Sequence, residues 1–324
     1  MITPDPSWTY SPERPVPVWE ADVHLFPETV VGVLNGRQWV CLERGTGRLL
    51  WEQRRLGRPN RICSLAGDVL IATEHRRNDG PWAANFGIYG VSLAEGRLVW
   101  TSHAPGRWGR FLRLLDFIPD FTNELRDDPL WFEGPEIVTS GGRRLEAATG
   151  TDIGCREVSD DSRRASETFS SRLLAWKEIP VGELGTLVLG RPGKPETPGH
   201  VGTDPLRFYL RSPEGDVCWQ FQADREERIR GPHYWGLSFD YFYPFVYFAA
   251  ADRLHASRPG GSLFRLLALD LRTGQFSQDL PVSPNELDWC EIESCDSSSL
   301  LVGTKEVTGK YQLSHFARGD TAST

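Results

Sequence analysis

Short apolar runs of strand length recur along the whole chain, and turn-forming residues separate them. Runs of this length, bounded by Gly, Pro, Asp, Asn or Ser, are typical of strands rather than of helices. The runs are TVVGVL (29–34), DVLIAT (68–73), EIVTSG (136–141), GTLVLG (185–190), FVYFAA (245–250), SLLVGT (299–304) and YQLSHF (311–316). The pattern therefore predicts an all-β chain.

A seven-residue phrase that ends in glycine occurs five times, at intervals of 49, 54, 65 and 59 residues. It predicts a β-hairpin, because a strand leads into a polar turn and a Gly with positive φ closes that turn before the next strand. In three copies a Trp follows the Gly by four positions. The glycines are Gly47, Gly96, Gly150, Gly215 and Gly274, and the tryptophans are Trp51, Trp100 and Trp219.

Each hairpin and the apolar run upstream of it supply the strands of a four-stranded unit, which cannot bury both of its faces alone. Stacking such units radially covers the faces and leaves only short edges. We expect the three tryptophans to fill the gaps between one unit and the next, so that they and the turn glycines are structural. The runs at 299–304 and 311–316 predict a last unit, which the N-terminal segment around Val16, Val18 and Trp19 completes.

Three of the phrases carry a resemblance to a known repeat. ALDLRTG (268–274), RLEAATG (144–150) and GTGRLLW (45–51) are similar to the phrase A-L-D-x-x-T-G-x-x-x-W of the quinoprotein-like (PQQ-repeat, BamB-like) β-propeller family. The resemblance implies a β-propeller of about six four-stranded blades, with seven as the alternative, closed by the N-terminal segment. We expect one domain, residues 1–324, with an insertion at 103–134 and a polar connector at 155–171.

Enzymes of this family carry an adjacent Cys-Cys pair beside the quinone and a secretory signal, and neither is found in this chain. The chain also lacks the H-E-x-x-H and G-x-S-x-G sequences and a complete phosphate or dinucleotide loop. We therefore predict no catalytic residue, no bound cofactor and no metal.

The segment DWCEIESCD (288–296) brings four carboxylates and two thiols close together, and so invites interpretation as a metal site. On a strand, however, Glu291 and Glu293 share one face, and Cys290 lies on the other. We expect a half-exposed strand with its thiols packed inward.

Charge and cysteine content narrow the classes of partner and compartment. Lys and Arg number 36 against 44 Asp and Glu, a net charge of -8, which disfavours binding to nucleic acid or to anionic membranes. No stretch approaches the roughly 20 apolar residues of a membrane-spanning helix. The six cysteines include no adjacent pair and no C-x-x-C, so that we expect reduced thiols in a cytoplasmic protein.

The long segments fall into the two kinds of connection that open on one face of a propeller. They either join one blade to the next or join a second strand to a third, at 54–61, 75–87, 103–134, 191–207, 223–244 and 251–265. Arg, Trp and Tyr, which protein interfaces favour, are interspersed there. The predicted partner-binding residues are Arg54, Arg58, Arg76, Trp82, Arg107, Trp108, Arg110, Tyr234, Trp235 and Tyr241.

These patterns predict a non-catalytic scaffold that binds a protein partner through its long-loop face, as a subunit of a larger assembly. The insertion at 103–134 either caps its own propeller or binds the partner, and the sequence does not decide between the two. The alternative is a propeller that binds a ligand or glycan, or acts as an enzyme, with a small molecule in its central funnel. Neither the partner nor the oligomeric state follows from the sequence.

Overall fold

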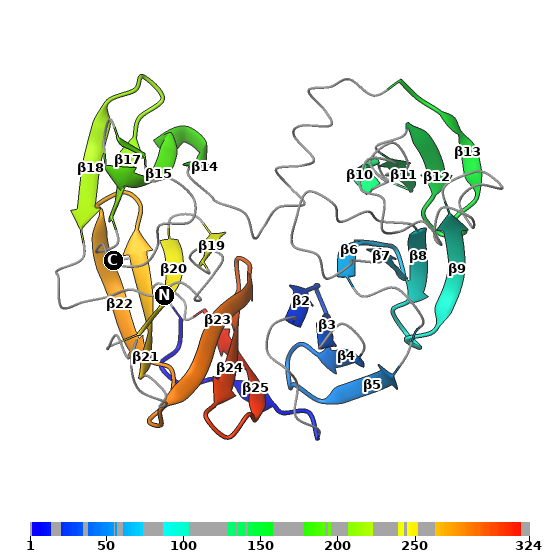
Figure 1. The fold of residues 1–324 in the computed structure, drawn as a ribbon, viewed down its shortest axis with the longest axis horizontal. Helices are drawn as coiled ribbons and strands as arrows, with labels where there is room; N and C mark the ends of the chain where they lie inside the picture. Colours follow the sequence, from blue (N-terminus) through cyan, green and yellow to red (C-terminus); the bar gives the residue numbers. More distant parts are fainter. Residues whose placement is uncertain are drawn as a thin grey trace, which may run out of the picture. The chain divides into compact units, whose positions relative to one another are not determined.

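The described part of the chain is built almost entirely of β-strands (Figure 1). The computed structural model describes residues 2–13, 21–34, 38–54, 56, 61–73, 87–103, 129–133, 135–139, 142–157, 178–191, 194–195, 207–222, 239–242, 245–251 and 263–318. Within these residues one 3₁₀ turn, Gly182–Leu184, is the exception to strand and irregular structure. The expectation of an all-β chain is therefore confirmed.

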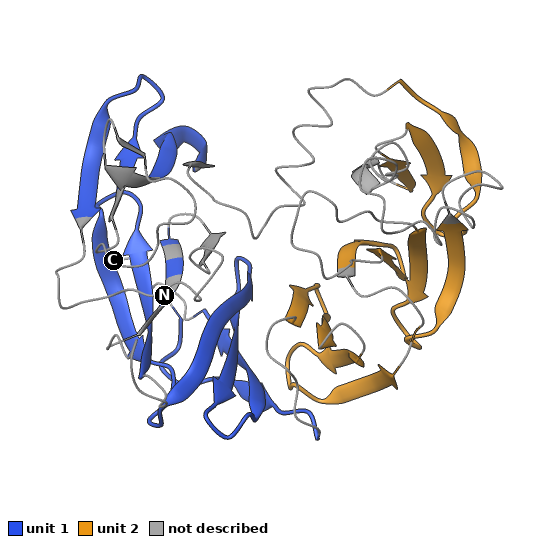
Figure 2. Ribbon diagram, in the orientation of Figure 1, with its two compact units in different colours: residues 1–18, 172–324 blue, residues 19–171 orange. Residues whose placement is uncertain are grey.

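The chain divides into two compact units, residues 19–171 and residues 1–18 with 172–324 (Figure 2). The expectation of a single domain stays a prediction. We call the unit of residues 19–171 the central unit and the other the terminal unit, since the latter holds the residues nearest both ends of the chain.

The central unit contains three four-stranded antiparallel sheets, in each of which strands that are neighbours in sequence are neighbours in space. Sheet I has the order β2 (Ala21–Leu25), β3 (Thr29–Leu34), β4 (Gln38–Glu43) and β5 (Leu49–Arg54). Sheet II consists of β6 (Arg61–Ala66), β7 (Val69–Thr73), β8 (Gly87–Ser92) and β9 (Leu98–His103). Sheet III consists of β10 (Pro129–Glu133), β11 (Glu136–Thr139), β12 (Arg143–Glu146) and β13 (Asp152–Cys155).

The terminal unit also contains three antiparallel sheets. Sheet IV has the order β14 (Glu178–Pro180), β15 (Thr186–Arg191), β17 (Arg207–Arg211) and β18 (Val217–Gln222), with β16 (Lys194–Pro195) paired to β15. Sheet V consists of β19 (Phe239–Phe242), β20 (Phe245–Ala251), β21 (Phe264–Asp270) and β22 (Gln275–Pro281). Sheet VI has the order β1 (Trp8–Tyr10), β25 (Tyr311–Ala317), β24 (Ser299–Glu306) and β23 (Leu287–Cys295). The four-stranded units expected from the repeat are thus present in both parts of the chain.

Each apolar run contains a strand because the inner strands of these sheets are buried on both faces. In β7, Leu70 packs in the cluster shared with sheet I, whereas Ile71 packs in the cluster shared with sheet III. Side chains alternate between the faces of a strand, so two-sided burial requires a continuous apolar run rather than an alternating one.

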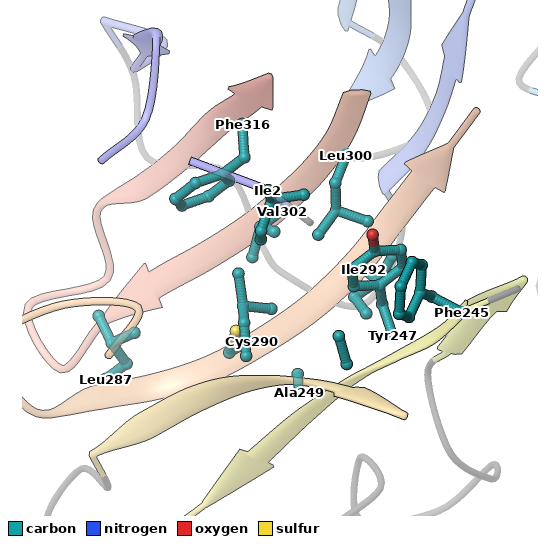
Figure 3. Packing of buried hydrophobic residues seen from close by; sticks show 12 residues of the cluster. Ile2, Phe245, Tyr247, Ala249, Leu287, Cys290, Ile292, Leu300, Val302 and Phe316 are labelled. Carbon is teal, nitrogen blue, oxygen red and sulfur yellow. The ribbon is translucent and has the colours of Figure 1, made fainter. Parts of the chain in front are cut away.

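The core of the terminal unit includes a cluster between sheets V and VI (Figure 3). Tyr247 of β20 and Ile292 of β23 lie in it, together with Ile2 from the N-terminal segment. Cys290 is buried in the same cluster, while Glu291 and Glu293 are only half-buried. The alternation expected for this strand is therefore observed.

The N-terminal segment supplies the last strand of sheet VI, although not with the residues expected. The strand is Trp8–Tyr10, in which Trp8 pairs with His315 of β25. The Trp8 and His315 rings stack with their centroids 5.0 Å apart and their planes inclined by 6°. Val16, Val18 and Trp19, which the sequence pointed to, lie outside the described residues.

Besides the two-residue β16, which lies within the expected loop at 191–207, two strands of the four-stranded sheets lie inside segments that the sequence assigned to connections. β10 begins within the expected insertion at 103–134, and β19 begins within the expected connection at 223–244. Each is the first strand of its sheet and pairs with one neighbour. Such short edge strands lack the long apolar run that marks the inner ones, and a proline at the first position, as in β10, is tolerated at an edge.

All six cysteines are free, and they differ in exposure. Cys41 and Cys290 are buried, whereas Cys155 and Cys218 are exposed. Burial raises the pKa of the Cys41 thiol to about 12, partly offset by a hydrogen bond with Thr29, and burial also raises that of Cys290. Because the thiolate is the reactive form, the two buried thiols should be inert near neutral pH.

We expect iodoacetamide to alkylate Cys155 and Cys218 rapidly in the native protein and to reach Cys41 and Cys290 only after unfolding. Peptide mass spectrometry of samples quenched over time measures this, and labelling in urea provides the control in which all sites react. Native alkylation of Cys41 as fast as that of Cys218 would contradict the assigned burial.

Candidate functional site

At three places, a tryptophan near the start of the fourth strand of a sheet contacts the turn glycine of the next sheet along the chain. Trp51 of β5 lies against Gly96, and Trp100 of β9 lies against Gly150. Trp219 of β18 lies against Gly274 in the same way. A Cβ on these glycines would come within 2.5, 2.4 and 2.6 Å of indole atoms, so no larger residue fits without displacing the ring. We call this arrangement the Trp–Gly joint.

Each joint also contains a hydrogen bond from the indole to the backbone of the neighbouring sheet. The Nε1–H of Trp51 donates to the Leu93 carbonyl at 2.7 Å, and that of Trp100 donates to the Ala147 carbonyl at 3.1 Å. Trp219 donates to the Leu271 carbonyl at 2.8 Å. In all three joints, the accepting carbonyl lies three residues before the contacted glycine. A single turn therefore provides both the glycine on which the indole packs and the carbonyl that accepts its hydrogen bond.

The turn that makes this possible depends on glycine. At Gly96 the backbone N–H donates to the Ser92 carbonyl, four residues back, and φ is 66°. Gly150 and Gly274 repeat the bond to the fourth residue back, with φ of 68° at both. Because L-residues rarely adopt such angles, the same glycine is needed for its φ and for the space above it.

The series changes after sheet III. Gly154 occupies the position four residues after Gly150, where three other sheets have Trp. The next turn glycine, Gly215, donates its N–H to the Ser212 carbonyl, only three residues back, and no atom of the described residues lies within 4 Å of a Cβ built on it. The copy that ends at Gly150 therefore lacks the Trp, and the next copy, which ends at Gly215, lacks the hydrogen bond to the fourth residue back.

In sheet V the place of the tryptophan is taken by Gln278, four residues after Gly274. Its side-chain amide forms two hydrogen bonds with the backbone of Ile2: Ile2 N–H donates to Oε1 at 3.0 Å, and Nε2 donates to the Ile2 carbonyl at 2.6 Å. The Ile2 side chain is 4% exposed within the cluster of sheets V and VI. Gln278 thus joins sheet V to the N-terminal segment. The position of Gln278 in the repeat was the only sequence signal for this contact.

The strand register separates two ends of each sheet. In sheet II, β6 begins at Arg61, opposite Thr73, and β8 begins at Gly87, opposite His103. The strand ends that lead to other sheets and the ends of β7 and β8 that are not joined by a short turn therefore lie at the same end of the sheet. The short turns lie at the other, and the Trp–Gly joints tie these turn ends together within the central unit. We call the ends opposite the Gly turns the loop ends.

The predicted partner-binding residues are mostly outside the described chain. Arg54 lies at the loop end of β5, where it is exposed and its Nε is 2.7 Å from Oε1 of Glu52. Tyr241 lies in β19, opposite Val246, and not in a connecting segment as expected. The remainder fall in segments that the structure does not describe, namely Arg58, Arg76, Trp82, Arg107, Trp108, Arg110, Tyr234 and Trp235.

In three of the Gly turns, an Arg pairs with a carboxylate of the same turn. Arg272 Nη2 lies 2.6 Å from Asp270 Oδ2, and this hydrogen bond holds the pKa of the Asp270 carboxyl below its usual range. Arg48 does the same for Glu43 in sheet I. These three turns therefore carry paired rather than isolated charges.

The acidic strand β23 has structural contacts for its carboxylates. Tyr311 donates its hydroxyl to Glu293 Oε1 at 3.0 Å, and Lys305 Nζ lies 3.1 Å from Asp288 Oδ2. Burial raises the pKa of Tyr311 well above its usual value, with Glu293 adding to the effect, so the phenol remains the donor. Among the described residues no group of three or more His, Cys, Asp and Glu side chains is placed to hold a metal ion.

In the part of the chain that the structure describes, no helix is long and apolar enough to cross a membrane.

Comparison with known proteins identifies structures but no family. No family model matches the chain, and no curated protein matches it significantly. BamB from Moraxella catarrhalis is similar at 12% identity with a TM-score of 0.40, over 100% of this chain and 99% of that one. The computationally designed Ika8 protein is similar at 10% identity with a TM-score of 0.37, over 94% and 98% of the two chains.

The Trp–Gly joints predict large losses of stability. Replacing Trp51, Trp100 or Trp219 with Ala should cost about 3 to 5 kcal/mol, because each change empties the space between two sheets. Gly96→Ala should cost about 1 to 3 kcal/mol through the collision with Trp51 and the positive φ. Thermal unfolding followed by circular dichroism measures both.

Gly45→Ala is the matched control. Gly45 lies in the same turn as the repeat glycine Gly47, but no atom of the described residues lies within 4 Å of a Cβ built on it. Unchanged unfolding temperatures in all three Trp variants, or equal temperatures for the Gly96 and Gly45 variants, would refute the joint.

Proposed function

We propose that the chain is a six-bladed β-propeller of the quinoprotein-like type, which serves in the cytoplasm as a non-catalytic scaffold and binds a protein partner through its loop ends. Sheets I to VI supply the blades, and the N-terminal strand β1 completes the last of them. The Trp–Gly joints support the radial arrangement, because each ties an outer strand to the turn of the next sheet along the chain.

The observation that carries the binding hypothesis is the unequal length of the connections at the two ends of the sheets. Turns between first and second strands, and between third and fourth strands, are short, as at 93–97. The longer segments between β9 and β10, between β18 and β19 and between β20 and β21 all leave from the loop ends. Long loops supported by a rigid sheet are where proteins place recognition residues.

The composition of these segments favours protein as the partner. They contain interspersed Trp and Arg, the residue types that dominate binding energy at protein interfaces. The net charge of -8 opposes a polyanionic partner such as nucleic acid. The six free cysteines are compatible with a reducing compartment.

A direct test compares the two ends of the sheets in partner capture. Charge reversal at Arg107 and Arg110, or replacement of Trp108 by Ala, should weaken capture at least tenfold, since a desolvated Trp or Arg anchor contributes about 2 kcal/mol or more. Affinity purification with the tagged protein, quantified by mass spectrometry, measures this for variants whose thermal stability is unchanged.

The control variants are Glu95→Lys and Glu214→Lys, which lie in the short turns at the opposite ends. They should retain capture. Loss of capture in these variants, with full capture in the loop-end variants, would show that the turn ends and not the loop ends bind the partner. This result would overturn the proposal.

The alternative function is a propeller that binds a small molecule or glycan, or that acts as an enzyme. We expect the purified protein to show no quinone-like absorption band and no dye-coupled alcohol oxidation after addition of calcium and quinone. Either signal would favour the enzymatic alternative over the scaffold. A parallel measurement on an established quinone-dependent dehydrogenase controls for the competence of the assay.

A further inference from the structure

Every sheet ends in two strands whose edges are open within the described chain. The end strands β2, β6, β10, β14, β19 and β23 each contain Asp, Glu or Arg, and we call the strands at the opposite ends the outer strands. β5, β9, β13, β18 and β22 each end their sheets, as β1 does in sheet VI. Half of the N–H and C=O groups of such a strand point away from the sheet and can pair with another extended segment. Proteins that remain monomeric therefore protect these edges with charges, prolines or short strands.

Four of the six outer strands carry such protection. β5 contains Glu52 and Arg54, and β22 contains Asp279 and ends in Pro281. β13 has only four residues and begins with Asp152, and β1 has only three residues. These strands resist the addition of another strand.

The strands β9 and β18 lack this protection. Their sequences, LVWTSH and VCWQFQ, have six residues each and contain no Asp, Glu, Lys, Arg or Pro. β9 is the more apolar of the two at its surface, with Leu98 37% and Val99 44% exposed, whereas β18 exposes a single large aliphatic side chain, Val217. Among the described residues β9 pairs with β8 alone.

We propose that the open edge of β9 is a self-association surface, on which β9 of a second copy of this chain pairs antiparallel across a two-fold axis. A strand edge is complementary to itself in this arrangement, because antiparallel neighbours exchange the same N–H and C=O groups.

Charge favours a second copy at this edge over other contacts between copies. With a net charge of -8, two molecules repel each other over most of their surfaces. The pairing of two β9 strands places no formal charges opposite each other, and it covers Leu98 and Val99, which are otherwise in water. The edge therefore combines the absence of facing charges with apolar area to bury.

The interface is small, which sets the expected affinity. Two six-residue strands bury less than the roughly 1,600 Å² of a standard protein interface, so the dimer should be weak and in the micromolar range. It should also be insensitive to salt, or strengthened by it, since added ions screen the net repulsion and break no ion pair.

Sedimentation velocity of the purified full-length protein tests the proposal. The weight-average mass should rise above the monomer value of 36.5 kDa as the concentration increases. Val99→Lys and Thr101→Lys should each raise the dissociation constant at least tenfold, because a lysine at an open edge disfavours pairing. Both residues are exposed, so the variants should keep the unfolding temperature of the parent protein.

Two further variants separate the β9 edge from nonspecific association. Leu50→Lys is the matched control: Leu50 is 42% exposed and follows Gly47 by three positions, as Val99 follows Gly96, but lies on a strand that already carries charges. It should leave the dissociation constant unchanged, as should Val217→Lys on β18. A parent protein that stays monomeric to about 200 µM, above the micromolar range expected for so small an interface, would overturn the proposal. Dissociation caused by Leu50→Lys or Val217→Lys but not by Val99→Lys would overturn it as well.

Discussion

The contact of an indole with a glycine turn is the interaction on which both units depend. A four-stranded sheet has two apolar faces and can be stable only if each is covered, so the structure must hold its sheets against one another. The indole covers apolar surface, and its N–H fixes the position through a carbonyl of the next sheet. A purely apolar contact would fill the same space without fixing the register between neighbouring sheets.

The joints explain why the two ends of a sheet differ so much. A turn that must present a bare glycine and a carbonyl to a neighbouring ring cannot accept insertions, since an added residue would move the surface away from the indole. The turn at Gly215 carries no such contact in the described chain, and its Gly N–H bonds three rather than four residues back. The Trp–Gly joints place no such constraint on the loop ends, from which the longer segments leave.

Local signals in the sequence predicted the inner strands, the hairpins and the positions of the joints. Inner strands buried on both faces need continuous apolar runs, and a joint needs a Gly and a Trp at fixed spacing, so both leave a mark within a few residues. Gln278 is marked only by its position four residues after Gly274, and Trp8–Tyr10 is not marked at all. Gln278 acts on a backbone segment 276 residues away, and the short β1 strand gains its stability from His315.

The candidate binding residues were harder to predict for a different reason. Arg54 and Tyr241 were chosen by residue type, yet Arg54 has an ion-pair partner in its own strand, and Tyr241 belongs to a sheet. Residue type alone does not distinguish a side chain that is available to bind another protein from one that already forms an ion pair or belongs to a strand of its own chain. The uncharged edge of β9 was visible in the sequence, but its importance depends on knowing which strands are outermost.

The completion of sheet VI by β1 also has a consequence for synthesis on the ribosome. Strands β23, β24 and β25 are translated almost 300 residues after β1. At a translation rate of about 5 to 20 residues per second, residues 2–10 remain without their partner strand for on the order of tens of seconds. During that time the hairpins of the central unit can fold from local contacts alone, but the aromatic β1 segment stays uncovered. A chaperone that holds this segment would therefore act on the nascent chain until β25 has been translated.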